Sequence, residues 1–181
     1  VEAEALGTAG AIRFAAREMQ LEETFLVLNG DVLTDLDIGA LVEFHDRHEA
    51  EATIALQAVS DPSRFGVVRT DDNGQVEEFI EKPPVGKSPS NHINAGTYVI
   101  NPSVVDRIPE NRSVSIEREI FPKMAEAETL YAMRSDTYWL DTGTPGQFLE
   151  ANLDVLQGRR KNKPTMPIAT VHPAARIEES V

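Results

Sequence analysis

The chain of 181 residues contains no cysteine. Disulfide bonds and thiolate metal sites are therefore excluded, and a bound metal would need oxygen or histidine ligands. Carboxylates suit a hard cation such as Mg²⁺. Among metals, the composition therefore favours magnesium.

Long apolar runs are also missing from the sequence. No apolar stretch approaches the roughly 20 residues that cross a membrane. The first residues, Val1 to Ala5, lack the basic start and the apolar middle of a signal peptide. We therefore expect a protein that acts in the cytoplasm and has no membrane partner.

Positive charge is scarce, with 17 Lys and Arg against 30 Asp and Glu and a formal net charge of -13. This balance argues against non-specific binding to nucleic acid or to an anionic membrane, although a local cationic site could still bind phosphate. The length suits one ordinary domain with a sizeable core. Small molecules are the partners that we expect.

The segment from Thr24 to Asp37 organises the rest of the chain. Its run Phe25-Leu26-Val27-Leu28 is typical of a strand that is buried on both faces. The run ends at Asn29-Gly30-Asp31, and ligands of open α/β sheets collect just beyond the carboxyl ends of strands. Asp31 is therefore a candidate metal ligand. The alternative is that these three residues form only a turn.

The remaining patterns alternate between helix and strand. Apolar residues at helical spacing predict helices, and short runs rich in β-branched residues predict strands. The pair Asn73-Gly74 predicts a tight turn between two antiparallel strands. We expect helices over 11–20, 38–48, 102–108, 116–121 and 145–157, and strands over 25–28, 52–59, 65–69, 76–80, 92–101, 129–134 and 138–141.

Local chemistry sets further expectations for the first half of the chain. Leu6 to Gly10 should form a small-residue loop before the first helix, and Asp35 or Asp37 should cap the second. Two prolines after Glu81-Lys82 should hold that pair in an extended conformation. Gly96, inside a strand, indicates a bulge or the close approach of a ligand.

In the second half, Ser115 should cap a helix that Pro122 interrupts. The sequence Thr144-Pro145-Gly146-Gln147 should open the last helix as a capping box, and Gly158 should end it. The apolar residues of that helix recur on one face and predict a buried stripe of Phe148, Leu149, Leu153 and Leu156.

These patterns predict an α/β domain over residues 1–158. Residues 159–167 are rich in basic side chains and are expected to form a solvated linker. Beyond it, Val171 and Ile177 lie six residues apart, which is the spacing of a hexapeptide β-helix. Residues 168–181 are thus expected to start a β-helix that the sequence does not continue.

Four positions at or near the ends of predicted strands carry site chemistry: Asp31, Glu81-Lys82, Asn94 and Asp141. Two separated carboxylates can hold a divalent cation that neutralises phosphate oxygens, and a lysine can hold a phosphoryl group. Taken singly, Glu81-Lys82 is explained as a surface ion pair and Asp141 as a helix cap. Only their convergence would make a site.

The sequence contains seven short motifs, in this order: Leu-Gly-Thr-Ala-Gly, Asn-Gly-Asp, Phe-Gly-Val-Val, Phe-Ile-Glu-Lys-Pro, Asn-Ala-Gly-Thr-Tyr, Ser-Ile-Glu-Arg-Glu-Ile-Phe-Pro and Tyr-Trp-Leu-Asp-Thr-Gly-Thr-Pro. Together they resemble the sugar-1-phosphate nucleotidyltransferases, most closely their mannose-1-phosphate guanylyltransferase branch. The resemblance extends from about Glu4 to Gly158. It implies a Rossmann-like α/β domain with a mixed sheet flanked by helices, often followed by a left-handed β-helix.

The resemblance implies a reaction between a nucleoside triphosphate, with GTP favoured, and a sugar-1-phosphate, with mannose-1-phosphate favoured. Leu6, Gly7 and Thr8 would contact the nucleotide base. Asp31 and Asp141 would bind Mg²⁺ and, together with Lys82, would carry the catalytic roles. The products would be a nucleotide sugar and pyrophosphate.

The same resemblance implies the residues that bind the sugar phosphate. Gly66 would approach the sugar through its backbone, and Glu81 would accept hydrogen bonds from sugar hydroxyls. Lys82 would hold the phosphate, and Asn94 would face the sugar.

One departure from the family pattern stands out. The glycine-rich loop with an arginine that cradles the triphosphate in this family has no counterpart before Leu6. We therefore expect Val1 to be an internal residue of a longer enzyme, or the chain to be a fragment, with little or no activity alone. In this family a strand precedes that loop. Without this strand the sheet would have an exposed edge, so we expect the chain to form a homo-oligomer.

Two alternatives use the same residues differently. Asp35-Leu36-Asp37 matches the Asp-x-Asp metal motif of nucleotide-sugar glycosyltransferases. A chain that keeps the fold without the chemistry would instead be a non-catalytic sugar-phosphate-binding or subunit module.

Overall fold

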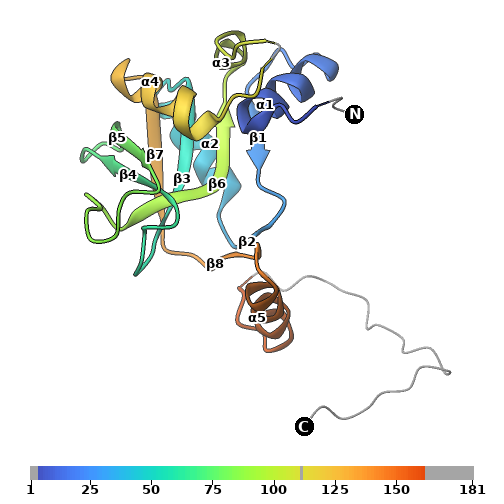
Figure 1. The fold of residues 1–181 in the computed structure, drawn as a ribbon, viewed down its shortest axis with the longest axis vertical. Helices are drawn as coiled ribbons and strands as arrows, with labels where there is room; N and C mark the ends of the chain where they lie inside the picture. Colours follow the sequence, from blue (N-terminus) through green and yellow to red (C-terminus); the bar gives the residue numbers. More distant parts are fainter. Residues whose placement is uncertain (1–3, 111, 162–181) are drawn as a thin grey trace, which may run out of the picture.

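The computed structural model describes residues 4–110 and 112–161. It is a mixed α/β fold in which a six-stranded sheet lies between helices (Figure 1). The elements in chain order are α1 (Gly7–Glu18), β1 (Phe25–Leu28), β2 (Val32–Thr34), α2 (Ile38–Arg47), β3 (Ala52–Ala58), β4 (Gly66–Thr70), β5 (Val76–Glu81), β6 (His92–Ile100), α3 (Pro102–Asp106), the π-helical turn η1 (Ile116–Ile120), α4 (Phe121–Glu126), β7 (Leu130–Ser135), β8 (Trp139–Asp141) and α5 (Pro145–Leu156).

The sheet is organised around β6. Its strands follow the order β5-β4-β6-β3-β7, and β1 pairs with the far half of β6. The β6 strand pairs antiparallel with β1, β3 and β4, whereas β3 and β7 are parallel. Val67 of β4 is opposite Ile93, near the start of β6, and Phe25 of β1 is opposite Ile100 at its end. The expected mixed sheet flanked by helices is confirmed.

A bulge at Gly96 bends β6 between its two sets of partners. Gly96 has φ +76°, and the pairing of β3 with β6 shifts register between Ile54 and Leu56. A Cβ on Gly96 would lie 2.8 Å from the Asn29 side chain, so a larger residue would displace the turn after β1. The bulge expected from the sequence is therefore present.

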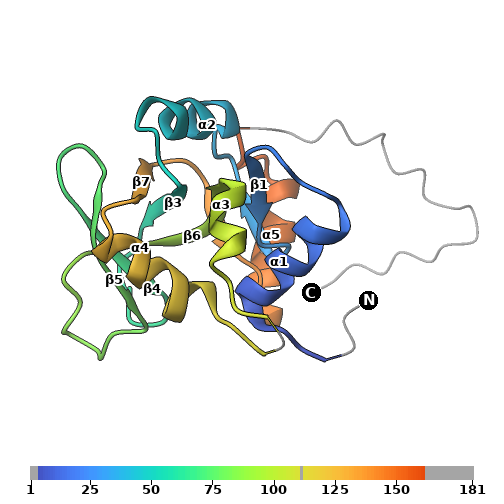
Figure 2. The same cartoon turned by 90° about the horizontal axis from the view of Figure 1, so that it is seen from above.

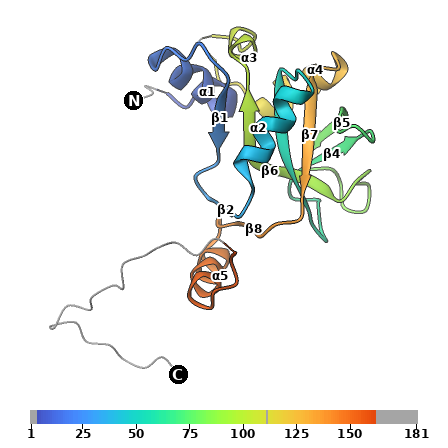
Figure 3. The same cartoon turned by 180° about the vertical axis from the view of Figure 1, so that it is seen from behind.

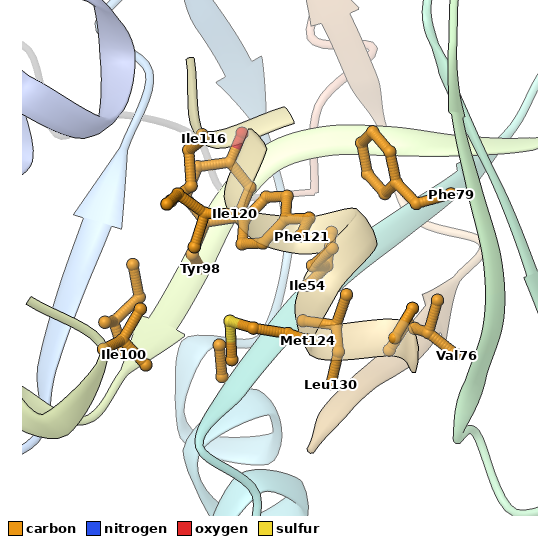
Figure 4. Close-up of a cluster of buried hydrophobic side chains, with 14 of the residues drawn as sticks. Ile54, Val76, Phe79, Tyr98, Ile100, Ile116, Ile120, Phe121, Met124 and Leu130 are labelled. Atoms are coloured by element: carbon orange, nitrogen blue, oxygen red, sulfur yellow. The ribbon is translucent and has the colours of Figure 1, made fainter. Parts of the chain in front are cut away.

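Helices cover both faces of the sheet. In Figures 2 and 3, α2 lies on one side of β3, β6 and β7, and Figure 2 places α4 on the other. Five consecutive residues of β3, Ala52–Leu56, are buried because they alternate between the two layers. Figure 4 shows the larger layer, where Phe121 and Met124 of α4 lie among Ile54, Tyr98 and Leu130. On the α2 side, Leu41, Ala55, Ala95 and Val99 are buried together.

Two predictions about helices differ from the structure, one at the start of α1 and one at Pro122. The expected loop at Leu6–Gly10 is largely the first turn of α1, which begins at Gly7. Its start is fixed by backbone bonds, with the Ala9 N–H donating to the Val114 carbonyl and the Val114 N–H to the Leu6 carbonyl. Pro122 does not interrupt the helix that Ser115 caps, because the π-helical turn η1 passes directly into α4 and Pro122 occupies the first turn of α4.

The prediction that β1 is buried on both faces is wrong. Phe25 and Val27 are half-buried against the core, while Leu26 and Leu28 are exposed. Among the residues that the structure describes, β1 pairs only with β6. The outer edge of β1 therefore carries no strand in this part of the chain, and self-association through it stays a prediction.

The predicted buried stripe of α5 is also wrong. Thr144 caps the helix as expected and Gly158 follows its end, but Phe148 is 62% and Leu156 83% exposed. Leu149 and Leu153 are exposed as well, and the buried positions are Ala151 and Asp154. In Figures 1 and 3, α5 lies beyond β2 and β8 and away from the six-stranded sheet. The apolar face therefore faces away from the core.

Substitutions of leucine should reveal this difference in burial. We expect Leu149→Ala to change the free energy of unfolding by less than about 0.5 kcal/mol, as at exposed sites. Leu41→Ala, which removes the same atoms from a fully buried side chain, should cost about 2–5 kcal/mol. Urea unfolding measures both. Equal losses would contradict the exposed position of the α5 face.

The segment after α5 is docked where the sequence predicts a solvated linker. The Arg160 guanidinium donates to the Asp35 carboxylate and to the Thr34 carbonyl, and the Lys161 amide donates to Asp35. Arg159 pairs with Asp154. The rest of the expected linker and the expected β-helix, residues 162–181, lie outside the described residues. No helix in the described part of the chain is both long enough and apolar enough to span a membrane.

Candidate functional site

Asp31 and Asp141 meet at one end of the short β2–β8 ribbon. Val32 is opposite Asp141 in the antiparallel register, and both the amide and the hydroxyl of Thr142 donate to the Asp31 carbonyl, at 2.8 and 2.9 Å. A Cβ placed on Gly143 would lie 2.9 Å from Asp141 Oδ1 and 3.9 Å from Asp31 Oδ2. The two carboxylates that the sequence singles out therefore flank the same point.

Six of the predicted site residues line one cleft of about 220 Å³. The cleft lies between the β2–β8 ribbon and the ends of β5 and β6, so it joins residues from distant parts of the sequence. Its wall also includes Asn29, Arg64, Phe65, Glu117 and Trp139. The six predicted residues are Asp31, Gly66, Glu81, Lys82, Asn94 and Asp141.

Lys82 does not have the extended conformation that the sequence predicts. Its φ is +52°, in the left-handed region that costs a lysine about 1–2 kcal/mol. Its amide donates to the Phe65 carbonyl at 3.0 Å, which ties it to the residue before β4. The turn directs the lysine away from the line of the β5 strand, and its side chain stays 59% exposed. Strain of this kind is often held in functional sites.

Glu81 is the more buried partner of the pair, with 17% of its side chain exposed. Its Oε1 lies 3.8 Å from the Lys82 Nζ, too far for a hydrogen bond. Gly66 gives it room, because a Cβ there would lie 2.8 Å from Glu81 Oε2. The pair is therefore a loose ion pair at the rim of the cleft, and its atoms stay available to a ligand.

The pKa of Glu81 is raised above its ordinary value of 4.5, first by burial and then by the negative charge of Glu117; Lys82 and Arg118 oppose the shift. A raised carboxyl pKa in the folded state means that folding loses stability as pH rises through it. We therefore expect Glu81→Gln to be more stable than the natural chain at pH 7, with the difference disappearing near pH 4. Urea unfolding at the two pH values tests this, and a variant that is less stable at pH 7 would contradict it.

The Asn94 amide is held in one orientation. Its Oδ1 accepts from the Gly96 amide at 3.0 Å, and its Nδ2 donates to the Tyr98 hydroxyl at 2.9 Å. Burial raises the pKa of Tyr98 well above its usual range, so this hydroxyl stays neutral and can accept. One amide N–H and one lone pair of Asn94 remain for a ligand in the cleft.

Sequence reasoning missed several residues of the cleft wall. Glu117 lies near the start of the helix predicted over 116–121, Arg64 lies in a turn before β4, and Phe65 and Trp139 lie in predicted strands. Phe65 and Trp139 form an edge-to-face pair with ring centroids 5.8 Å apart, and the Trp139 indole N–H donates to the Ala95 carbonyl at 2.9 Å. The motif that contains Glu117 was visible, but its side-chain direction was not.

The residues expected to contact a base lie apart from this cleft. Leu6 lines a separate hollow next to α1, and Gly7 lies against Val114. The Thr8 hydroxyl donates to Glu117 at 2.8 Å and accepts from the Ile116 amide at 2.9 Å. Thr8 is thus the one member of this group that connects to the cleft, through Glu117. Their contact with a base stays a prediction.

The Asp-x-Asp alternative fails on geometry. The side chain of Asp35 is 1% exposed, and its carboxylate is occupied by Arg160 and Lys161. Asp37 is the N-cap of α2, where it accepts from the Ala40 amide. Neither carboxylate faces the cleft, so a glycosyltransferase-type metal site at this motif is wrong.

Asp31 and Asp141 fit a magnesium ion by the chemistry of their donors. No group of three or more potential ligands among His, Cys, Asp and Glu occurs in residues 4–110 and 112–161. Mg²⁺ is usually held by one or two carboxylates together with water and substrate phosphates. Two adjacent oxygen donors beside an open cleft match that pattern.

The fold is that of a nucleotidyl transferase, and comparison with known proteins agrees. The family model described as nucleotidyl transferase matches residues 1–158, so the chain belongs to this family.

Among curated relatives, the chain is 44% identical over 167 residues to mannose-1-phosphate guanylyltransferase catalytic subunit beta of Drosophila melanogaster, covering 91% of this chain and 44% of the relative. It is 41% identical over 175 residues to mannose-1-phosphate guanyltransferase of Yarrowia lipolytica, covering 96% and 47%. The chain thus spans about half the length of these curated relatives.

Solved structures share the fold. HddC from Yersinia pseudotuberculosis superposes with a TM-score of 0.67 at 29% identity, covering 83% of this chain and 63% of that one. A structure of the same protein complexed with GMP-PN gives 0.66 at the same identity and coverage. UDP-glucose pyrophosphorylase complexed with UDP-glucose gives 0.73 at 19% identity, covering 86% and 64%, a likeness that supports the fold alone.

Proposed function

We propose that the cleft binds a sugar-1-phosphate, with mannose-1-phosphate favoured, and that the protein transfers a nucleotidyl group to it from a nucleoside triphosphate, with GTP favoured. The observation that carries the proposal is the convergence of Asp31, Asp141, Glu81, Lys82 and Asn94 on one cleft. The names of the two curated relatives support mannose and guanine as the sugar and the base. The cytoplasm, expected from the sequence, belongs to the same proposal.

Different residues of the cleft bind the phosphate and the sugar. Lys82 is exposed and cationic, so it binds the phosphate as a point charge. Glu81 accepts hydrogen bonds from sugar hydroxyls, Asn94 offers one donor and one acceptor, and Gly66 lets the sugar approach the β4 backbone. Trp139 and Phe65 close one wall with apolar surface.

The reaction needs no protein nucleophile. An oxygen of the sugar phosphate attacks the α-phosphorus of the triphosphate, and a new P–O bond forms. The bond from the α-phosphorus to the bridging oxygen breaks, and pyrophosphate leaves with the electron pair. Such chemistry depends on positioning and on neutralising charge. Asp31 and Asp141 would hold magnesium, which when bound neutralises charge on phosphate oxygens.

The nucleotide half of the proposal rests on the resemblance. Leu6, Gly7 and Thr8, near the start of α1, would contact the base. Because the chain spans about half the length of the curated relatives, we propose that this chain alone binds sugar phosphate and has little or no transferase activity.

Calorimetry tests sugar-phosphate binding, and a pyrophosphate-release assay tests the proposed lack of transferase activity. We expect mannose-1-phosphate to bind this chain and GTP alone to bind weakly or not at all. Pyrophosphate release should stay near background with both substrates and Mg²⁺. Robust release would contradict the inactivity of this chain, whereas failure of any sugar-1-phosphate to bind would contradict the proposed function. Binding without transfer by any longer form of the protein would instead favour a non-catalytic module.

A further inference from the structure

Glu117 is the one acidic residue of the cleft wall without a role in the proposed function. It is the second residue of η1 and lines the cleft together with Glu81 and Asn94. Its neighbour Glu119 pairs with Arg112. Two carboxylates of the same short turn therefore have different surroundings, and only Glu117 reaches the cleft.

The Glu117 carboxylate is held from one side. Its Oε2 accepts from the Thr8 hydroxyl at 2.8 Å and from the Ser115 hydroxyl at 2.7 Å. Within the described residues, no hydrogen bond reaches its Oε1. Thr8 is itself fixed, because its oxygen accepts from the Ile116 amide. The carboxylate is thus oriented before any ligand arrives, with one oxygen free.

Charge limits what that free oxygen can bind. Glu81 lies close enough for the charge of Glu117 to raise its pKa, and both carboxylates raise the pKa of Tyr98. A phosphate placed between the two carboxylates would be repelled, whereas an uncharged group with hydroxyl donors would satisfy both. The cation of the cleft wall next to Glu81 is Lys82. Arg64 is the other cation of this wall. Repulsion by the two carboxylates therefore favours a ligand that turns its phosphate toward Lys82 and Arg64 and its hydroxyls toward Glu81 and Glu117.

We propose that Glu117 is a specificity-determining residue that accepts a hydrogen bond from a ring hydroxyl of the sugar, and that Thr8 and Ser115 position it. The inference rests on the proposed function, since it concerns the same cleft. It adds a link between the start of α1 and the sugar site. The alternative is that Glu117 only anchors η1 to α1, in which case its charge would not matter to a ligand.

Glu117→Gln separates the two roles. The amide keeps the shape and can still accept from Thr8 and Ser115, but its NH₂ cannot accept from a sugar hydroxyl. By calorimetry, we expect the affinity for mannose-1-phosphate to fall about tenfold or more, as for a hydrogen bond to a charged group. The affinity for inorganic phosphate should change by less than about twofold. Thr8→Val should give a smaller loss in the same direction, because one support of the carboxylate is removed.

Deoxysugar phosphates give a readout that a purely structural role would not change. The natural chain should lose about tenfold in affinity for one monodeoxy analogue of mannose-1-phosphate. Glu117→Gln should bind that analogue and the parent sugar phosphate about equally. Glu119→Gln, in the same turn but outside the cleft, is the matched control and should discriminate between them like the natural chain.

The outcomes distinguish this inference from the proposed function. If Glu117→Gln binds and discriminates as the natural chain does, while Lys82→Ala has lost binding, the role of Glu117 is overturned and the proposed function stands. If the natural chain binds no sugar-1-phosphate, both are overturned. If Glu117→Gln fails to fold, a Thr8→Val chain with natural affinity and natural discrimination overturns the inference.

Discussion

Lys82→Ala should lower the affinity for mannose-1-phosphate by roughly tenfold to a hundredfold, the loss expected for a hydrogen bond between two charged groups. Lys82 is the cation of the cleft beside Glu81, and its side chain is exposed, so its removal leaves no buried group without a partner. The free energy of unfolding should therefore change little. Calorimetry and urea unfolding measure the two effects.

Lys87→Ala is the matched control, since it removes the same charge from an exposed site in the following loop. Its affinity should stay within about twofold of the natural value, since exposed charges interact weakly at a distance. Equal losses in the two variants would mean that Lys82 acts through net charge alone. That result would contradict a specific phosphate contact.

Asp35→Ala should cost about 3–5 kcal/mol of folding free energy, as expected when a buried ion pair loses one partner. Asp35 Oδ1 accepts from two nitrogens of Arg160 at 3.0 and 2.8 Å, and Oδ2 accepts from the Lys161 amide at 2.7 Å. The side chains are 1% and 15% exposed. The variant would keep a largely buried guanidinium without its carboxylate.

Asp37→Ala is the control for this substitution, two residues along the chain. It removes only the cap of α2 and should cost about 1 kcal/mol. A double variant, Asp35→Ala with Arg160→Met, should recover part of the loss, because the unpaired charge is gone. Urea unfolding of the natural chain and the three variants measures these differences. A loss below about 1 kcal/mol for Asp35→Ala would show that the pair does not hold the segment after α5.

Much of the fold was predictable because its signals are local. The Asn73-Gly74 turn, the Asp37 cap and the Thr144-Pro145 helix start each follow from the chemistry of a few neighbouring residues. The bulge at Gly96 was also visible, because glycine weakens the interior of a strand and often marks a bulge there. Local turn and cap chemistry thus placed most elements to within a few residues.

The errors concern contacts between distant segments. Periodicity identified which residues of α5 share a face, but it did not show whether another element covers that face, and Phe148 is exposed. The same holds for Leu28 of β1. Arg160 looked solvated because its partner, Asp35, lies 125 residues away in the sequence. Nothing in the sequence around Lys82 indicated a positive φ.

The sequence predicted the proposed ligand-binding residues of the cleft better than the other residues that line it. Asp31, Glu81, Lys82, Asn94 and Asp141 stand out because each lies at or near the end of a predicted strand, and the structure brings them together. Glu117 was missed because a glutamate in the first turn of a helix has a sufficient local explanation. Its bonds to Thr8 and Ser115 appear only in three dimensions.

The chain contains a single tryptophan, and it lies in the wall of the cleft. The indole N–H of Trp139 therefore gives one resolved signal in a ¹H–¹⁵N spectrum of the labelled protein, and this signal reports on the cleft. Titration with mannose-1-phosphate should shift it to saturation, and Lys82→Ala should need roughly ten to a hundred times more ligand for the same shift. Saturable binding that shifts signals elsewhere and leaves the Trp139 signal unmoved would contradict the cleft as the sugar-phosphate site.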